Sequence, residues 1–147
     1  MDDLDLVEIL IVEDNPDDAE LTLHALSQDE IKGKALHLRN GVEALNFIFA
    51  KKEFLDRKIQ KDLKLVLLDL KLPKLDGLEV LRKIREDERT KTLPVVIFTS
   101  SREKRDIIEA YSLSVNSYVV KPVEFEQYIK VVKAVGTYWE SINEKPI

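Results

Sequence analysis

The stretch that decides the fold is Leu65–Pro73, LVLLDLKLP, in which a run of apolar residues leads directly into Asp69. Four consecutive apolar residues are typical of a strand that is buried on both faces. An isolated carboxylate inside an apolar core costs several kcal/mol unless it is paired. We therefore expect a buried strand that delivers Asp69 to the mouth of a crevice, where the carboxylate itself is not buried.

Four other short runs are likewise rich in Val, Ile, Leu or an aromatic residue: Val7–Val12, Ala35–Leu38, Leu93–Phe98 and Tyr118–Val120. Polar stretches with helical spacing alternate with them: Asn15–Leu26, Gly41–Phe54, Asp76–Ile84, Glu103–Leu113 and Glu124–Asn143. This alternation predicts an α/β fold, a doubly wound five-stranded parallel sheet with five helices on its two faces. The common strand order is 2-1-3-4-5, the flavodoxin-like arrangement, and its ligands bind at the carboxyl ends of the strands.

The length and composition favour a single domain over residues 1–147. A net charge of −5 argues against nucleic acid as the main partner, because phosphate binding needs a basic surface. The chain has no cysteine, which excludes disulfides and thiol catalysis. No apolar run approaches the roughly 20 residues of a membrane helix, and the acidic start differs from a signal peptide. We therefore expect a cytoplasmic protein without a membrane partner.

Five polar residues stand where the predicted strands end. Glu13 and Asp14 follow the first strand, Asp69 the third, Thr99 the fourth and Lys121 the fifth. Because the carboxyl ends of parallel strands share one edge of the sheet, we expect these side chains to meet there. Three neighbouring carboxylates repel one another, and a hard cation such as Mg²⁺ relieves that repulsion.

Such a site suits phosphoryl transfer, which depends on positioning and charge neutralisation. Aspartate can act as the nucleophile and form an aspartyl-phosphate. We expect Asp69 to attack the phosphoryl group, the metal and Lys121 to stabilise its oxygens, and the Thr99 hydroxyl to donate a hydrogen bond to one of them. Taken singly, each residue is more typical of a helix cap, a loop charge or a surface charge. Their convergence on one edge is what favours a site.

Four motifs occur in order along the chain: ILIVEDNP, LVLLDLKLPKLDG, VVIFTSS and YVVKPV. With these motifs the sequence resembles the receiver domain of two-component response regulators, the CheY-like family, over nearly its whole length. The resemblance implies that Asp69 is the phosphoacceptor, that Asp14 ligates Mg²⁺ directly and that Glu13 acts largely through water. It also implies that the backbone carbonyl of Lys71 completes the protein ligands of the metal.

The same resemblance implies how phosphorylation is signalled. Thr99 and Lys121 are the threonine and lysine that respond to the phosphoryl group, and Tyr118 matches the aromatic switch position three residues before the lysine. Thr99 would move toward the phosphoryl group and Tyr118 would rotate inward behind it. The Lys121-Pro122 peptide bond is expected to be cis, a conformation essentially restricted to X-Pro bonds.

Three features narrow the resemblance. The segment Lys51–Lys64 is longer than in a minimal receiver, Leu113–Tyr118 reads LSVNSY in place of the commoner Gly-Ala form, and the chain ends in the aromatic-rich EFEQYIKVVKAVGTYWESI. Together they are similar to the stand-alone response regulators partnered with bacterial phytochrome histidine kinases. Only one helix's length of chain follows Pro122, so we expect no output domain and a signal that is read by an unknown downstream protein.

The predicted last helix carries apolar and aromatic residues around about half of its circumference, more than one core-facing stripe usually needs. Either the helix lies deep in its own domain, or half of this arc packs against a partner. The second interpretation, which the resemblance also implies, is a symmetric homodimer through the fourth helix, fifth strand and last helix. The expected contact residues are Phe125, Tyr128, Val132, Tyr138 and Trp139.

The leading hypothesis is a signalling switch that is not an enzyme beyond its own phosphorylation and dephosphorylation. An alternative is a phosphorelay shuttle that passes the phosphoryl group to a histidine phosphotransfer protein. A phosphatase that forms an aspartyl-phosphate would usually carry a second acid two residues after the nucleophile, as its general acid and base. This chain has Lys71 there, and a lysine with an ordinary pKa cannot do that work near neutral pH. A flavin-binding protein of similar topology would cradle a phosphate after the first strand, where Glu13 and Asp14 would repel it.

Overall fold

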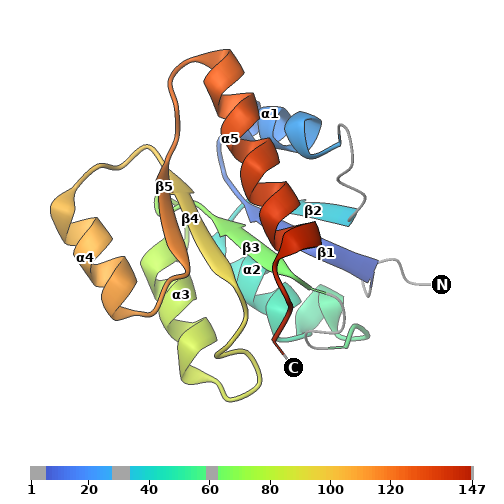
Figure 1. The fold of residues 1–147 in the computed structure, drawn as a ribbon. Coiled ribbons are helices and arrows are strands. Elements are labelled where there is room, and N and C mark those ends of the chain that lie inside the picture. The colour runs from blue at the N-terminus through green and yellow to red at the C-terminus, as the bar shows by residue number, and fades with distance from the viewer. Residues whose placement is uncertain (1–5, 28–33, 59–62, 147) are drawn as a thin grey trace.

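The computed structural model describes residues 6–27, 34–58 and 63–146, and their fold is an open sheet between two layers of helices (Figure 1). Five strands pair in parallel in the order β2-β1-β3-β4-β5. The strands are β1 Val7–Val12, β2 Lys34–Leu38, β3 Leu65–Leu68, β4 Val95–Thr99 and β5 Ser117–Val120. The doubly wound sheet and the strand order predicted from the sequence are confirmed.

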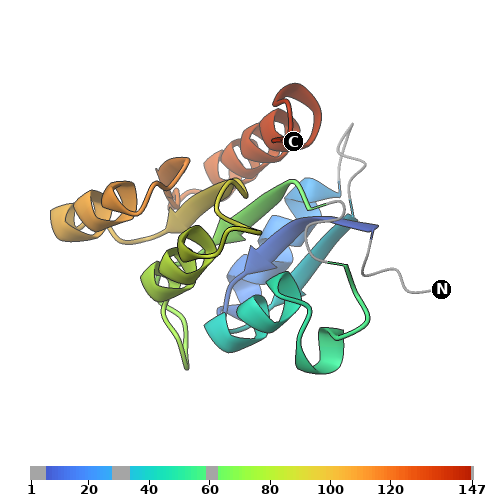
Figure 2. The ribbon, with the colours of Figure 1, turned by 90° about the horizontal axis from the view of Figure 1, so that it is seen from below.

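Five α-helices connect the strands. They are α1 Pro16–Leu26, α2 Gly41–Ile48, α3 Gly77–Glu86, α4 Lys104–Ser112 and α5 Phe125–Thr137. Helices α1 and α5 pack against each other on one face of the sheet, while α2, α3 and α4 lie in sequence on the other face (Figure 2). The connections after β1 and β3 therefore run to opposite faces of the sheet. Both leave the sheet at the same edge, where the carboxyl ends of the strands lie.

Alternate residues along the strands pack into two hydrophobic cores, one under each layer of helices. On β1, Ile9 and Ile11 pack with the residues of α1 and α5, whereas Leu10 and Val12 pack with those of α2 and α3. Every residue of β3 and β4 is buried, as expected for central strands of a parallel sheet. Each fully buried large aliphatic side chain contributes about 1.5–3 kcal/mol. The central strands thus form a fixed platform for the polar residues that follow them.

The helix predicted over Gly41–Phe54 is shorter than expected, because α2 ends at Ile48. Ala50 then takes a positive φ angle of 55°, which a residue with a side chain does not adopt inside a right-handed helix. A short 3₁₀ turn, η2 (Lys52–Phe54), follows. Residues 59–62 of the long segment noted in the sequence lie outside the described residues.

The buried side chain of Arg57 closes the carboxyl end of α2. Its guanidinium lies over the ring of Phe47, with the central carbon 3.9 Å from the ring centroid, and it donates hydrogen bonds to the carbonyls of Phe47 and Ile48. The last carbonyls of a helix have no partner within the helix. Arg57 supplies one from the segment that follows, and so fixes that segment against α2.

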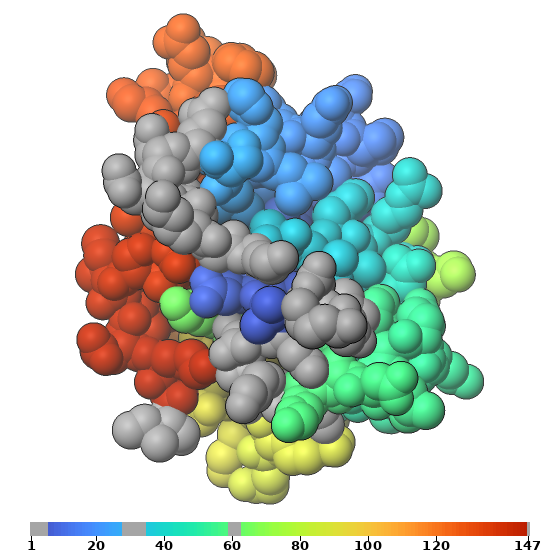
Figure 3. Space-filling model, turned by 90° about the vertical axis from the view of Figure 1, so that its right-hand side faces the viewer, coloured from blue at the N-terminus to red at the C-terminus, as the bar shows by residue number. Residues whose placement is uncertain are grey.

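The helix predicted over Glu124–Asn143 also changes character, because α5 ends at Thr137 and continues as a π-helical turn, η3 (Tyr138–Ile142). Lys64, just before β3, holds this end of the chain through Glu140, with an ion pair of 3.7 Å to the carboxylate and a hydrogen bond of 3.1 Å to the carbonyl. In Figure 3 the red C-terminal segment lies at the side of the molecule next to the start of β1.

The side chain of Asp76 caps the start of helix α3, and replacing it tests how much this cap contributes to stability. The carboxylate of Asp76 accepts a hydrogen bond of 3.1 Å from the backbone N–H of Glu79. Asp76→Ala is expected to lower the free energy of unfolding by about 1 kcal/mol in urea titrations, because the N–H loses its partner. Asp76→Asn keeps an acceptor and should stay close to wild type; an equal loss in both variants would contradict the cap.

Candidate functional site

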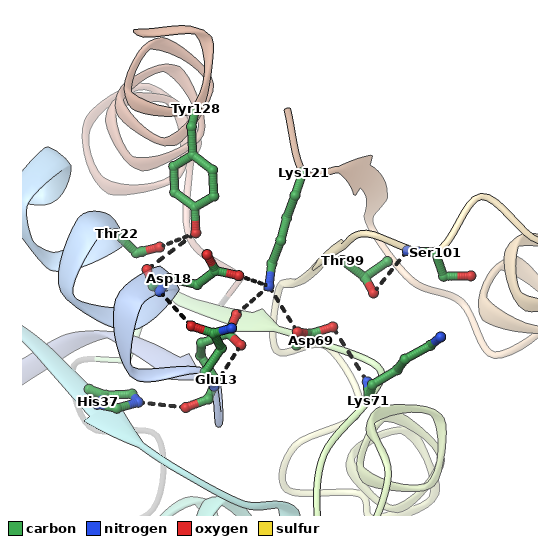
Figure 4. A network of polar contacts seen from close by, with 11 residues as sticks. Glu13, Asp18, Thr22, His37, Asp69, Lys71, Thr99, Ser101, Lys121 and Tyr128 are labelled. Atoms are coloured by element: carbon green, nitrogen blue, oxygen red, sulfur yellow. Dashed lines mark hydrogen bonds and ion pairs between the residues drawn. The ribbon is translucent and has the colours of Figure 1, made fainter. Parts of the chain in front are cut away.

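The polar residues that follow the strands converge at the carboxyl edge of the sheet, and Figure 4 shows the contacts that Glu13, Asp69, Thr99 and Lys121 make there. Glu13, Asp14 and Asp69 each offer one carboxylate oxygen, and the three oxygens lie within 4.8 Å of one another. Thr99 ends β4 and Lys121 directly follows β5. The fold therefore brings Glu13, Asp14, Asp69 and Lys121 together, and Thr99 ends the neighbouring strand β4 at the same edge of the sheet.

Asp69 is buried, with 7% of its surface exposed, so the expectation of an unburied carboxylate at the crevice mouth is wrong. Its backbone N–H continues the sheet by donating to the Val12 carbonyl at 3.1 Å, which draws the residue into the end of the sheet. Its Oδ2 is 3.0 Å from the Nζ of Lys121, and its Oδ1 accepts from the Lys71 N–H at 3.4 Å. A paired and hydrogen-bonded carboxylate tolerates burial.

Lys121 is the centre of the network. Its Nζ lies 2.7 Å from Glu13, 2.8 Å from Asp18 and 3.0 Å from Asp69. An ammonium group has three N–H donors, so each donor meets one carboxylate. The three acceptors come from three different parts of the fold: the end of β1, the first turn of α1 and the end of β3.

Asp18 was missed by the sequence reasoning. It lies on the first turn of α1, whose N-cap Asn15 directly follows Glu13 and Asp14, the pair of acids after β1. Because the first turn of a helix after a parallel strand lies at the same edge of the sheet as the strand end, this spacing was the available signal. The sequence could not show that the side chain turns toward Lys121.

Burial and charge shift the pKa values of two groups in this network. Burial, together with the nearby charge of Asp69, raises the pKa of Glu13 to about 7, although its hydrogen bond with Lys121 works in the opposite direction. Burial alone would lower the pKa of Lys121, but hydrogen bonds to Asp18 and Glu13 and the charge of Asp69 raise it above its ordinary value. Lys121 is therefore a cation at neutral pH, and the carboxylates around it outnumber it.

A second group of contacts joins β4, the loop after it and β5. The buried Thr99 accepts a hydrogen bond through its Oγ1 from the N–H of Ser101 at 3.4 Å. The Tyr118 hydroxyl donates to the Ser101 carbonyl at 3.0 Å, and the Ser101 hydroxyl donates to Asp106 of α4 at 2.6 Å. Ser101 thus connects the predicted switch residues Thr99 and Tyr118 with the first turn of α4.

The peptide bond between Lys121 and Pro122 is trans, as no cis peptide bond occurs among the described residues, so the predicted cis bond is wrong for this structure. The trans isomer of an X-Pro bond is favoured by about 0.5–1 kcal/mol unless the surroundings select the other one. With this bond trans, Lys121 still reaches its three carboxylates.

A groove of about 770 Å³ opens beside the acidic cluster, between the loop after β3 and the start of α4. Its walls are formed by Asp14, Leu70, Lys71, Leu72, Pro73, Asp76, Leu78, Glu103, Arg105 and Asp106. Asp14 is exposed and shares this groove with Lys71. A small charged molecule can therefore approach the cluster from the side of Asp14.

The predicted dimer residues differ in how much of their surface is exposed. Tyr128 and Val132 have only 4% and 1% of their surface exposed, because they pack on the sheet with α1. Their assignment to a dimer contact is wrong, since neither has surface left to offer. Phe125 and Tyr138 are 61% and 45% exposed, while Trp139 packs against the edge of the core and its ring contacts that of Tyr138.

The comparisons with known proteins agree with this geometry. Residues 9–133 match the response regulator receiver domain, and the chain belongs to this family. It is 40% identical over 138 residues to the "Probable methanogenesis regulatory protein FilR2" of Methanothrix harundinacea, covering 94% of this chain and 86% of that protein. The receiver-domain resemblance seen in the sequence is therefore confirmed.

Solved structures give the same family with the same fold. The phosphorylated cyanobacterial phytochrome response regulator RcpA superposes with a TM-score of 0.89 at 34% identity, covering 96% of this chain and 99% of that one. The Mn²⁺-bound form of response regulator Rcp1 superposes with a TM-score of 0.88 at 33% identity, with the same coverage. No helix within the described ranges is long and apolar enough to cross a bilayer.

Proposed function

We propose that this response regulator accepts a phosphoryl group on Asp69 from a phytochrome-type sensor histidine kinase and signals through its surface. The observation that carries the proposal is the buried Asp69 carboxylate, held 3.0 Å from Lys121 and within reach of two further acids. An Asp69 oxygen forms a bond to phosphorus as the P–N bond of a phosphohistidine breaks. The departing imidazole nitrogen keeps the electron pair of that bond and takes up a proton.

The residues present fit a divalent cation. Glu13, Asp14 and Asp69 offer only oxygen ligands, which hard cations such as Mg²⁺ prefer, and the Lys71 carbonyl is the fourth ligand expected from the family. Bound there, Mg²⁺ would neutralise charge on the phosphoryl oxygens. The structure of Rcp1 contains Mn²⁺, which supports a divalent ion in this chain, and Mg²⁺ is our proposal for it.

The protein's own groups supply the rest of the chemistry. Lys121 is a cation at the end of β5 that faces the attacking carboxylate, and the buried Thr99 hydroxyl can turn from Ser101 to a phosphoryl oxygen. Such a turn would loosen the contact that Ser101 makes with Tyr118. We propose that this exchange of hydrogen bonds moves Tyr118 and the start of α4, and so changes the surface that a downstream protein reads.

The kinase assignment is tested by light-dependent phosphotransfer. The similarity to RcpA, a phytochrome response regulator, supports a phytochrome as the kinase, and we propose a cytoplasmic location for this chain. A purified phytochrome kinase labelled with radioactive phosphate should transfer label to wild type within minutes, to a degree that depends on illumination, and should not label Asp69→Asn. Transfer only from a kinase of another class would contradict the phytochrome assignment but not the phosphoacceptor role.

The alternative output is a phosphorelay shuttle. No observation favours it over a signalling surface, and we propose that the chain has no enzymatic activity beyond its own phosphorylation and dephosphorylation. Adding a histidine phosphotransfer protein to the labelled chain distinguishes the two outputs. Retention of the label on this chain supports the signalling surface, and quantitative transfer of the label supports the shuttle.

We also propose a homodimer through α4, β5 and α5. Large apolar side chains are exposed on α4, at the start of α5 and on the η3 turn that continues it, including Ile108 at 68%, Phe125 at 61% and Tyr138 at 45%. Ile108→Glu is expected to weaken self-association about tenfold or more in sedimentation experiments on the phosphorylated protein, because a charge would be buried in the contact. Leu55→Glu, at an exposed position after α2, should leave association unchanged. A monomeric wild type at high micromolar concentration would contradict the dimer.

A further inference from the structure

We propose that Asp18 is a positioning residue that aims the ammonium group of Lys121 at Asp69 during phosphoryl transfer. The inference rests on the phosphoacceptor role proposed above for Asp69. It adds a fourth carboxylate to the site, one that binds neither the metal nor the phosphoryl group and acts only through Lys121.

The N–H donors of Lys121 are saturated by carboxylates. Its three N–H donors meet three carboxylates, and the two shortest contacts, 2.7 Å to Glu13 and 2.8 Å to Asp18, go to side chains that do not react. The third contact, 3.0 Å, goes to the carboxylate of Asp69, the group that reacts. Because Glu13 and Asp18 hold two of the N–H donors, the third N–H is directed at Asp69. Figure 4 shows the three contacts spreading from the Nζ of Lys121.

The backbone of Asp18 is itself fixed at both of its polar groups. Its N–H donates to the side chain of Asn15 at 3.0 Å, and its carbonyl accepts from the hydroxyl of Tyr128 at 3.2 Å. That hydroxyl also shares a buried hydrogen bond of 2.9 Å with Thr22. The first turn of α1 is therefore held against α5, and Asp18 is a fixed anchor for a long and otherwise flexible lysine side chain.

Phosphoryl transfer also redistributes negative charge next to Lys121. As the Asp69 oxygen bonds to phosphorus and the bond to the leaving group breaks, negative charge develops on the oxygens of the transferring phosphoryl group. An N–H that already points at Asp69 needs no reorientation to meet one of these oxygens. Without Asp18, one donor of Lys121 turns to water and the side chain gains rotamers that point away. The maximal rate of transfer falls, while binding of the donor molecule does not change.

A purely electrostatic role for Asp18 makes the opposite prediction. A negative side chain near the site repels an incoming phosphoryl group, so its removal would accelerate phosphorylation. Asp17 provides the matched control, because it lies on the same first turn of α1, is exposed and carries the same charge. The sign of the effect at Asp18, compared with Asp17, distinguishes positioning from simple repulsion.

The experiment follows phosphorylation of the full chain by acetyl phosphate and Mg²⁺ with intact-mass spectrometry. Asp18→Asn is expected to lower the maximal rate about five- to tenfold at an unchanged half-saturating concentration of acetyl phosphate. Asp17→Asn should match wild type. An Asp18→Asn rate equal to or above that of wild type overturns the proposal. A wild type that forms no adduct refutes the proposed function instead, and the positioning role with it.

Dependence on Lys121 is tested by a double-mutant cycle. In a Lys121→Met background, Asp18→Asn should have no further effect; the same slowing in both backgrounds overturns the proposal. If Lys121→Met leaves no measurable rate, Tyr128→Phe decides, because it removes the hydroxyl that holds the Asp18 carbonyl and leaves every charge in place. A rate reduced about twofold supports the positioning role, and an unchanged rate overturns it.

Discussion

Asp14→Asn is expected to weaken Mg²⁺ binding about 100-fold, the largest loss from any single change in this site that leaves Asp69 in place. Changes to groups around a metal ligand already lower affinity about 10- to 100-fold, and Asp14 offers a carboxylate oxygen of the cluster itself. Its carboxylate is exposed on the groove side, so its loss leaves the core intact. Isothermal titration calorimetry of Mg²⁺ into the unphosphorylated protein measures the change directly.

The control for this prediction again uses the first turn of α1. Asp17→Asn removes the same charge from a nearby exposed position, and it should change Mg²⁺ affinity less than about twofold because screening by salt weakens charges that are not ligands. Equal losses in Asp14→Asn and Asp17→Asn would show that the net charge of the edge, and not a ligand at Asp14, holds the ion.

Gly77→Ala is expected to destabilise the protein by about 3 kcal/mol, the upper end for overpacking a well-packed interior. A Cβ at this position would lie 2.2 Å from the carbonyl oxygen of Asp69 and 2.8 Å from the Cα of Leu70. Both are backbone atoms, so neither can turn aside. The strain would fall on Asp69, the proposed phosphoacceptor, and the phosphorylation rate should decrease together with the midpoint of urea unfolding.

The direction of the stability change in Gly77→Ala shows whether a steric conflict exists at this position. At a site without steric conflict, replacing glycine by alanine stabilises a protein by about 0.4–1 kcal/mol through the unfolded state. Lys83→Ala, at an exposed position on the same helix, should change stability by less than about 0.5 kcal/mol. A Gly77→Ala variant as stable as wild type would mean that α3 can shift away from the end of β3.

The sheet and its functional edge were predictable because both follow from short-range patterns. Runs such as Leu65–Leu68 are apolar throughout, and this pattern identifies central parallel strands. Once the strand order is known, the residues that follow the strands must share an edge. Glu13, Asp69 and Lys121 could therefore be assigned to one site from their positions after three separate strands.

The details that the sequence did not predict depend on tertiary contacts. Asp18 looks like an ordinary acid of a first helical turn, and only the three-dimensional structure shows its contact with Lys121. Burial of Asp69 is tolerated because that lysine pairs with it, which no local pattern reports. On α5 the apolar arc was visible, but the side that faces the sheet was not, and so Tyr128 and Val132 were assigned to a partner surface although they lie in the core.

The central claim is that Asp69 accepts a phosphoryl group in a reaction that depends on a divalent cation. The most direct test is the intact mass of wild type and Asp69→Asn after incubation with acetyl phosphate, with and without Mg²⁺. We expect one phosphoryl adduct on wild type, formed only with Mg²⁺ and absent from the variant. No adduct on wild type, or an adduct of equal yield on Asp69→Asn, would contradict it.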